Sequence, residues 1–561
     1  MEPPHNVSVA FESAVSIILQ RDSSAAREGM IFEGDRNEID QYLQAVDEIA
    51  RSMKLMSTSE DWSEANIVIQ TAIARANSVI QIAIARLVDE FVNILSYPFN
   101  PRYSSSSSSL TDTSLYDEDY LDYDAPSTEA VYHLRSIVER MNSVGHVGQC
   151  IQAYRKVRKT LMEARCCSLG TEKLSTGDVR GLEAVELEAM IKRWKRIANV
   201  CVRGLFAIEK QLCHEIFQGL GIDTEDLDAY FLETVSAIQL LNFAEAMSTT
   251  CPRSPERLFS ILELLQTMSY LLPDMEVLFQ SKASESIRIQ AAEILRRLSG
   301  AAKEILCKFE KAVLHELSPF PVPGGAIDSL TMSVMKYIIR ISVYEKTLVE
   351  LPSMDLKYSN DLMIPDMKFQ ELGEQTPLAL QLIRIIVILQ FKLEVKSKEY
   401  NDAALAHLFM ISNVHYIIER IEGCSELKTM IGTDYFKQLM CIFGRAVISY
   451  QRSTWLSVFH CLRDEWILWM DKTAVRGRLK SFNALFKKVL ATQAAWSVPD
   501  LQLREELRIL ILHKLIPCYY IFMRRFCLKM PKRPSRPHQN IKDHQSICET
   551  SGVAGYNCQT L

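Results

Sequence analysis

The sequence has little of what marks strands. Its 561 residues include 20 glycines and 19 prolines, below the usual shares of about 7% and 5%. No segment alternates apolar and polar residues for long, which argues against the α/β and α+β classes. The glycines and prolines cluster in short breaks between long apolar-periodic runs, and this pattern favours helices.

The sequence also lacks disulfide and membrane-span signals. Its 14 cysteines form no C-x-x-C pair, and apart from Cys166-Cys167 they are scattered singly. The first residues, MEPPHNVSVA, show no signal-peptide pattern. Free, mostly buried thiols in a reducing cytoplasm are therefore expected. The most apolar run, Leu378 to Phe391, has 14 residues and contains Arg384, so it is shorter than the ~20 residues that a bilayer span requires.

Motifs that carry catalysis are missing or incomplete. His214-Glu215 and His315-Glu316 begin like zinc-binding helices, but neither histidine has a second histidine four residues later. No G-x-x-x-x-G-K-[ST] loop and no G-x-S-x-G elbow occurs. The acidic run Glu225 to Ala229 lacks the hydroxyl residue of a diphosphate-binding metal motif. We therefore expect no enzyme, no metal and no cofactor, and rank a diphosphate or nucleotide enzyme last.

Composition divides the chain into four segments. Residues 1–97 are predicted to form a helical region, in which Thr58-x-x-Asp61 resembles a capping box. A face that we interpret as ordinary core, with a coiled-coil seam as the alternative, consists of Ile80, Ile84, Leu87, Phe91 and Ile94. Residues 98–128 form a Ser-rich acidic flexible linker, with six acidic residues from Asp112 to Asp124. The linker is either a phosphorylated regulatory segment or a solvated spacer.

The third segment, residues 129–530, repeats amphipathic runs without a fixed period. We predict an all-α fold, an elongated rod of stacked helical bundles. Ser497-Val-Pro-Asp500 has a capping-box pattern, and the helix after it has a predicted buried stripe of Leu503, Leu507, Leu510 and Ile511. Leu479, Phe482, Phe486 and Val489 line one face of the preceding helix. The fourth segment, residues 531–561, is predicted to be a divergent, disordered tail.

Charge is uneven along the chain. The net charge of −6 gives no global reason to bind nucleic acid or an anionic membrane. The segment 514–542 nevertheless has no acidic residue and eight basic ones: Lys514, Arg524, Arg525, Lys529, Lys532, Arg533, Arg536 and Lys542. Four well-placed basic residues at an anionic membrane contribute roughly 4 kcal/mol, which corresponds to about millimolar affinity. A solvated tail is the alternative. A second basic stretch, Arg476 to Lys480 with Lys487 and Lys488, either extends this surface or is an exposed helix face.

Eight blocks of the sequence resemble, in order, the plant members of the seventy-kilodalton subunit family (Exo seventy) of the exocyst complex. Each block is predicted to be a helix with an apolar stripe. The residues that carry the resemblance are therefore expected to pack in the core, and none of them forms a catalytic motif. The blocks are Met30–Ile49, Leu205–Phe217, Gly324–Ile338, Leu408–Ile421, Tyr450–Trp455, Arg478–Phe486, Ser497–Arg508 and Lys514–Phe522.

The resemblance implies a non-enzymatic subunit that tethers secretory vesicles to the plasma membrane before fusion. It implies assembly with other exocyst subunits through the N-terminal region, small GTPases as a further class of partner, and no nucleic acid. It also implies a cytoplasmic protein, peripherally associated with the plasma membrane or vesicles, that binds phosphoinositides through basic residues. The candidate lipid-binding residues are Lys514, Arg524, Arg525, Lys529, Lys532 and Arg533.

After Phe526 the sequence departs from the family pattern. Pro531, Pro534 and Pro537 recur every third residue, so no helix can run through them. We expect the last bundle to lack a helix or more. The alternative function is therefore a helical adaptor of the same family that has lost membrane docking and serves immunity, signalling or autophagy partners.

Overall fold

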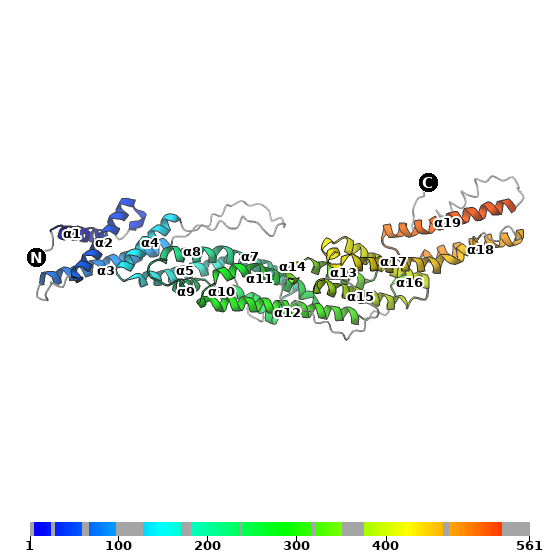
Figure 1. Ribbon diagram of the computed structural model, residues 1–561, viewed down its shortest axis with the longest axis horizontal. Helices are drawn as coiled ribbons and strands as arrows, with labels where there is room; N and C mark the ends of the chain where they lie inside the picture. The colour runs from blue at the N-terminus through cyan, green and yellow to red at the C-terminus, as the bar shows by residue number, and fades with distance from the viewer. Residues whose placement is uncertain are drawn as a thin grey trace. The chain divides into compact units, whose positions relative to one another are not determined.

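The computed structural model describes residues 5–23, 29–58, 67–96, 127–169, 179, 181–235, 237–316, 320–349, 375–463 and 471–529. These residues form helices joined by turns, with no strand among them, which confirms the all-α prediction (Figure 1). The chain forms two compact units, Met1–Ala301 and Ala302–Leu561. Many of the helices that follow one another pack together within each unit, so the predicted stacking of helical bundles is confirmed there.

The first unit is built from long helices and a few short turns of helix. They are α1 (His5–Arg21), η1 (Ile31–Glu33), α2 (Arg36–Thr58), α3 (Ile67–Ser96), α4 (Thr128–Ser143), α5 (Val147–Leu169), α7 (Ala184–Asn199), the π-helical η3 (Val200–Leu205), α8 (Phe206–Phe217), α9 (Thr224–Thr234), α10 (Ala237–Thr250), η4 (Pro255–Arg257), α11 (Leu258–Leu278) and η5 (Lys282–Ser284). Helix α12 (Glu285–His315) begins in this unit and ends in the second.

The N-terminal helices share one apolar core with α4, α5, α8 and α9. The face predicted on α3 is part of it: four of its residues are buried, and Ile94 is partly buried against them. The predicted cap at Thr58 is wrong, because Thr58 is the last residue of α2 and α3 begins at Ile67. Its partner Asp61 lies outside the described residues, as does the predicted linker up to residue 126.

Two buried carboxylates tie helices of this core together. Glu90 on α3 accepts hydrogen bonds from the backbone N–H groups of Ile31, at 2.7 Å, and Phe32, at 3.4 Å, and it pairs with Arg86. Glu209 on α8 pairs with Arg158 on α5, with the closest nitrogen and oxygen 2.6 Å apart. The Tyr154 hydroxyl also donates to Glu209 at 2.6 Å. These bonds satisfy groups that would otherwise be costly to bury.

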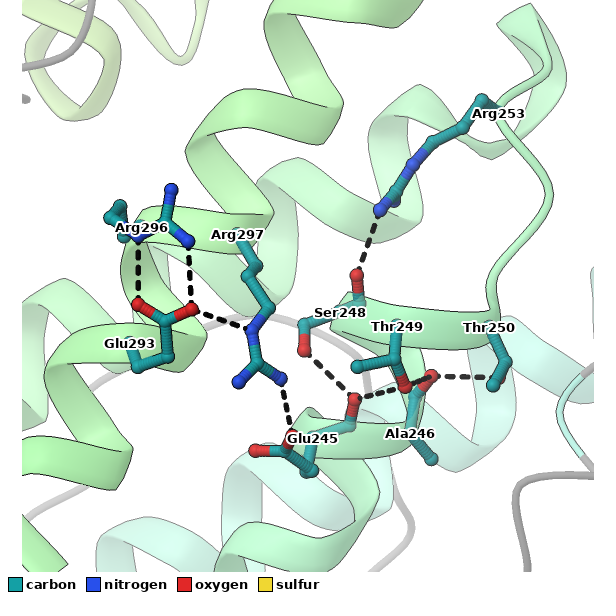
Figure 2. A network of polar contacts seen from close by, with 9 residues as sticks. All are labelled: Glu245, Ala246, Ser248, Thr249, Thr250, Arg253, Glu293, Arg296 and Arg297. Carbon is teal, nitrogen blue, oxygen red and sulfur yellow. Dashed lines mark hydrogen bonds and ion pairs between the residues drawn. The ribbon is translucent and has the colours of Figure 1, made fainter.

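A half-buried ion-pair network links α10 to α12. Arg297 lies between two carboxylates, Glu293 on its own helix and Glu245 on α10 (Figure 2). Glu293 also accepts two hydrogen bonds of 2.7 Å from Arg296. These bonds to Arg296 and Arg297 lower the pKa of Glu293 to about 2.

The second unit contains the end of α12 and the helices after it. They are η6 (Pro323–Gly325), α13 (Ser329–Ser342), α14 (Glu345–Val349), α15 (Pro377–Ser397), α16 (Ala403–Glu422), α17 (Ser425–Cys461), α18 (Lys472–Gln493) and α19 (Leu501–Lys529). The apolar run 378–391 lies in α15 and is mostly buried in this unit. Its charge, Arg384, is paired with Glu310 at 2.7 Å. Among the described helices, none is both long and apolar enough to cross a membrane.

A buried amide organises the junction of α13, α15 and α16. Asn413 on α16 accepts hydrogen bonds from the Asp328 backbone at 2.9 Å and from the Thr331 hydroxyl at 2.7 Å. Asp328 in turn caps α13 by accepting from the Leu330 backbone and pairs with Lys396 of α15 at 2.6 Å. These bonds fix the start of α13 against its neighbours.

Helix α17 is interrupted near its start at Gly432, which has φ 76° and ψ 166°. Only glycine adopts that backbone conformation readily. The Gln375 side chain donates a 2.8 Å hydrogen bond to the Ile431 carbonyl beside the break. A Cβ atom at position 432 would lie 2.8 Å from the same side-chain nitrogen. The sequence analysis did not foresee this break.

Candidate functional site

Helix α19, which carries the predicted basic residues, begins one turn later than its sequence pattern suggested. Asp500 is the capping residue, and its side chain accepts a 2.6 Å hydrogen bond from the Leu503 backbone N–H. Ser497 instead donates its backbone N–H to the Gly324 carbonyl at 2.8 Å. The capping box predicted at Ser497 is therefore wrong, because Ser497 is already bonded to the turn before α13.

One side of α19 packs against α17 and α18. Its buried residues are Leu503, Leu507, Ile511, Leu515 and Phe522, in one core cluster with residues of both helices. Aromatic rings join the hairpin, with Phe482 of α18 and Tyr519 of α19 separated by 5.4 Å between centroids. The predicted stripe of α19 is correct at three positions and wrong at Leu510, which is 39% exposed. Leu510 lies outside the buried stripe because the buried residues follow one another in steps of four from 503 to 515.

The face predicted on α18 is confirmed. Phe482 is buried, and Leu479, Phe486 and Val489 are partly buried against the same core cluster. Phe482 and Phe486 stack at 5.7 Å between centroids, and Phe486 lies 6.0 Å from the Trp455 ring of α17. The apolar spacing read from the sequence therefore identified the side of α18 that packs inward.

Three of the predicted lipid-contacting residues have described side chains on α19. Lys514 is exposed and donates a 2.7 Å hydrogen bond to the Gln451 side chain of α17. Arg524 is exposed and Arg525 half-buried. Lys529 is the last residue of α19, with a side chain outside the described residues, and Lys532 and Arg533 lie outside them entirely. The lipid-binding role of these six residues stays a prediction.

The second basic stretch forms an exposed face of α18. Arg476, Lys480 and Lys487 are exposed and follow one another by four and seven residues, which places them on one side of the helix. Lys488 is exposed beside them, while Arg478 is half-buried and donates to the His460 carbonyl at 3.1 Å. Helix α18 contains no acidic residue. The charged side chains on its outward face are therefore all basic.

Acidic residues on α19 are confined to its first two turns. Glu505 pairs with Arg508 at 2.7 Å, and this arginine holds the pKa of Glu505 below its usual value. Glu506 is exposed and accepts from the Gln502 side chain at 3.0 Å. From residue 507 to residue 529 the helix has no Asp or Glu. All the charged residues of α18, and of α19 from residue 507 onward, are therefore basic.

Catalytic groupings are not seen in the described part of the chain. No cluster of three or more His, Cys, Asp or Glu side chains that could hold a metal occurs among the described residues. His214 contacts Asp228 at 3.1 Å, beside Lys210, so it belongs to an internal ion-pair cluster between α8 and α9. The described acidic residues Glu225 and Asp226 are exposed at the start of α9. His214 therefore takes part in an ion pair between two helices, and Glu225 and Asp226 lie on the surface.

The burial of the cysteine side chains differs in part from the prediction. The described cysteines are free, as predicted, but only five of them are buried: Cys150, Cys166, Cys201, Cys213 and Cys251. Cys167, Cys441 and Cys518 are exposed. The prediction of mostly buried thiols is therefore wrong for the described part, because single cysteines on amphipathic helices also occupy outward positions.

Comparison with known protein families gives two matches. The C-terminal family of the Exo70 exocyst complex subunit matches residues 192–543, and the N-terminal family of the exocyst complex component Exo70 matches residues 10–97. The first match extends beyond Phe526, where the sequence was expected to depart from the family. The expected loss of a terminal helix concerns residues beyond 529, which lie outside the described part, and stays a prediction.

Individual proteins give a consistent result. The chain is 28% identical to exocyst complex component EXO70A1 of Arabidopsis thaliana, over 93% of this chain and 84% of that protein. It is 30% identical to EXO70C2 of the same plant, over 88% of this chain and 74% of that protein. In structure it resembles the Saccharomyces cerevisiae exocyst component Exo70p, with a TM-score of 0.56 and 14% identity over 96% of this chain and 98% of the yeast chain.

Proposed function

This chain belongs to the Exo70 family of exocyst complex subunits, and from that premise we propose that it helps to tether secretory vesicles to the plasma membrane before fusion. In this proposal it acts by binding, with other exocyst subunits as its partners. It carries no catalytic role and is located in the cytoplasm, peripherally on the plasma membrane or on vesicles. The division into a partner-binding region 1–97, a linker 98–128, a helical domain 129–530 and a tail 531–561 is part of the same proposal.

The observation that supports membrane contact is the charge of the C-terminal hairpin. Its outward positions include Arg476, Lys480 and Lys487 on α18 and Lys514 and Arg524 on α19, without an acidic residue on α18 or beyond residue 506 on α19. Each basic residue near an anionic membrane surface contributes about 1 kcal/mol. Five such residues give roughly 5 kcal/mol, so one copy of the chain binds weakly and several linked copies bind firmly.

Co-sedimentation with lipid vesicles tests this role. We expect the full chain to bind vesicles that contain phosphatidylinositol 4,5-bisphosphate and to bind neutral phosphatidylcholine vesicles at least about tenfold less. Changing Arg476 and Lys480 to Glu lowers the binding, whereas Lys192→Glu on α7, whose side chain is 64% exposed, leaves it unchanged. Equal binding to both kinds of vesicle would refute the membrane role and favour the adaptor without membrane docking.

Assembly with the complex is tested separately. A pull-down of purified exocyst subunits with the full chain as bait should retain them, and it should do so whether or not the hairpin charges are reversed. Failure to retain any of them, with vesicle binding intact, would contradict the tethering role.

A further inference from the structure

A run of basic residues in α18 leads up to one exposed serine. The segment Arg476–Ser481, with the sequence RGRLKS, places arginines five and three residues before Ser481 and a lysine directly before it. The side chain of Ser481 is exposed. Protein kinases select their substrates in part by charge patterns, and arginines at these two positions form the pattern that arginine-directed serine kinases recognise. The segment therefore has the sequence of a phosphate acceptor.

Helix α18 is held weakly enough for a kinase to reach that serine. The acceptor serine enters a kinase in an extended segment, so the helix around it has to open locally. Only two of the 22 residues of α18 are buried, Val475 and Phe482, whereas eleven of the 20 residues of α16 are. Gly477 lies inside the basic run, and in a helix glycine favours opening about fivefold over alanine. The segment with the motif therefore opens more easily than a helix held by a full apolar face.

A phosphate on Ser481 would lie among the basic side chains of α18. Arg478 and Lys488 are three and seven residues away, which places them on the same side of the helix as Ser481. Lys480 is its neighbour in the sequence, and Lys488 is about 10 Å away along the helix axis, roughly one Debye length at moderate ionic strength. A phosphoserine carries about two negative charges at pH 7. It therefore offsets about two of the positive charges of this helix.

We propose that Ser481 is phosphorylated by an arginine-directed protein kinase and that the phosphate weakens the attraction of α18 to an anionic membrane. The effect on the membrane rests on the proposed function. In the reaction the Ser481 Oγ attacks the γ-phosphorus of ATP and forms the new O–P bond. The bond between the γ-phosphorus and ADP breaks, ADP leaves with the electron pair, and the hydroxyl proton passes to the catalytic aspartate of the kinase.

The expected weakening follows from the charge. Each basic residue near an anionic membrane strengthens binding about fivefold, so the loss of two positive charges weakens it about 30-fold. Ser481→Glu adds one negative charge and should weaken binding about fivefold.

Mass spectrometry of the full chain tests the acceptor site. After incubation with protein kinase B and MgATP, peptide mapping should find phosphate on Ser481, and Ser481→Ala should lower the intact mass by one phosphate. Ser425→Ala is the matched control, because Ser425 is exposed at the start of α17 with Glu422 three residues before it. This substitution should leave the number of phosphates unchanged. A wild-type chain without phosphate on Ser481 overturns the proposal.

The rate of modification tests the local opening of α18. Gly477→Ala leaves every basic residue in place, and nothing lies within 4 Å of the new Cβ atom. It should slow phosphorylation of Ser481 about fivefold, because the helix opens less often. A rate equal to that of the wild type overturns the requirement for opening.

Co-sedimentation with vesicles that contain phosphatidylinositol 4,5-bisphosphate tests the consequence. The chain phosphorylated on Ser481 should bind about 30-fold more weakly than the unmodified chain. Ser425→Glu adds a charge at the start of α17 and should leave binding unchanged. Equal binding of the modified and unmodified chains overturns the electrostatic effect. Absence of binding by both chains overturns the proposed membrane contact, whereas phosphate found on Ser481 establishes the acceptor site independently of lipid.

Discussion

The buried ion pair between Arg158 and Glu209 gives a sharp prediction about what holds the first unit together. The two side chains are 1% and 0% exposed, and Tyr154 donates to the same carboxylate. Glu209→Ala leaves a guanidinium buried without its counter-charge and a hydroxyl without its acceptor. Breaking a buried pair in this way costs about 3–5 kcal/mol. We therefore expect the free energy of local unfolding of α5 and α8 to be lower by this amount in Glu209→Ala than in the wild type.

Replacing the whole polar cluster should cost much less. In the triple variant Tyr154→Phe, Arg158→Met and Glu209→Leu, no charge or hydroxyl is left to desolvate, and the volumes remain similar. Replacement of a buried ion pair by apolar residues is often neutral or stabilising, so the triple variant should regain at least about 2 kcal/mol of the loss caused by Glu209→Ala. The burial that raises the pKa of Tyr154, together with the adjacent Glu209, keeps its hydroxyl protonated as a donor in the native protein.

Hydrogen exchange measured by mass spectrometry is the suitable assay, because two units make a single unfolding transition unsafe to assume. Peptides from α5 and α8 report the opening free energy of the cluster directly. Glu304→Ala is the control, because Glu304 is 51% exposed on α12. This substitution should change the opening free energy by no more than about 0.5 kcal/mol. If the triple variant opens as easily as Glu209→Ala, the cost comes from lost packing and the electrostatic reasoning fails.

Two further predictions concern a backbone break and a surface network. Gly432→Ala should destabilise the second unit by about 1–3 kcal/mol or more, since its conformation strains any other residue and a Cβ there meets the Gln375 side chain. Gly444→Ala in the same helix, with nothing within 4 Å of the new Cβ, should be neutral or stabilising. Equal opening free energies of the two variants, measured by hydrogen exchange of α17 peptides, would contradict the argument. The Glu293 carboxylate, with its pKa lowered to about 2, should stabilise the fold above its unfolded pKa and lose that contribution as pH falls from about 4.5 toward 2. The difference in the opening free energy of α12 between wild type and Glu293→Gln, measured by hydrogen exchange, should therefore shrink over that range, and a constant difference would show that its bonds to arginine do not depend on charge.

The helices and their inward faces were predictable because apolar spacing reports burial directly. The stripe on α3 and the face of α18 are examples, and in both the partner surface is simply the nearest apolar core. The breaks and caps were less predictable. Gly432 lies in a run that reads as continuous helix, and the backbone beside it is held by Gln375, from a distant part of the sequence. Ser497 matches a capping pattern, but its backbone is bonded to Gly324, and this contact between distant segments decided where α19 begins.

The candidate site was predictable in charge but not in geometry. Basic residues without acidic neighbours are visible in the sequence, and the described residues of both basic stretches indeed lie on the hairpin of α18 and α19. On α19 the apolar spacing identified three of the four predicted buried positions, but large apolar residues also lie on its exposed side, so spacing alone could not separate every buried position from an exposed one. Leu510 was for this reason assigned to the core although it is exposed.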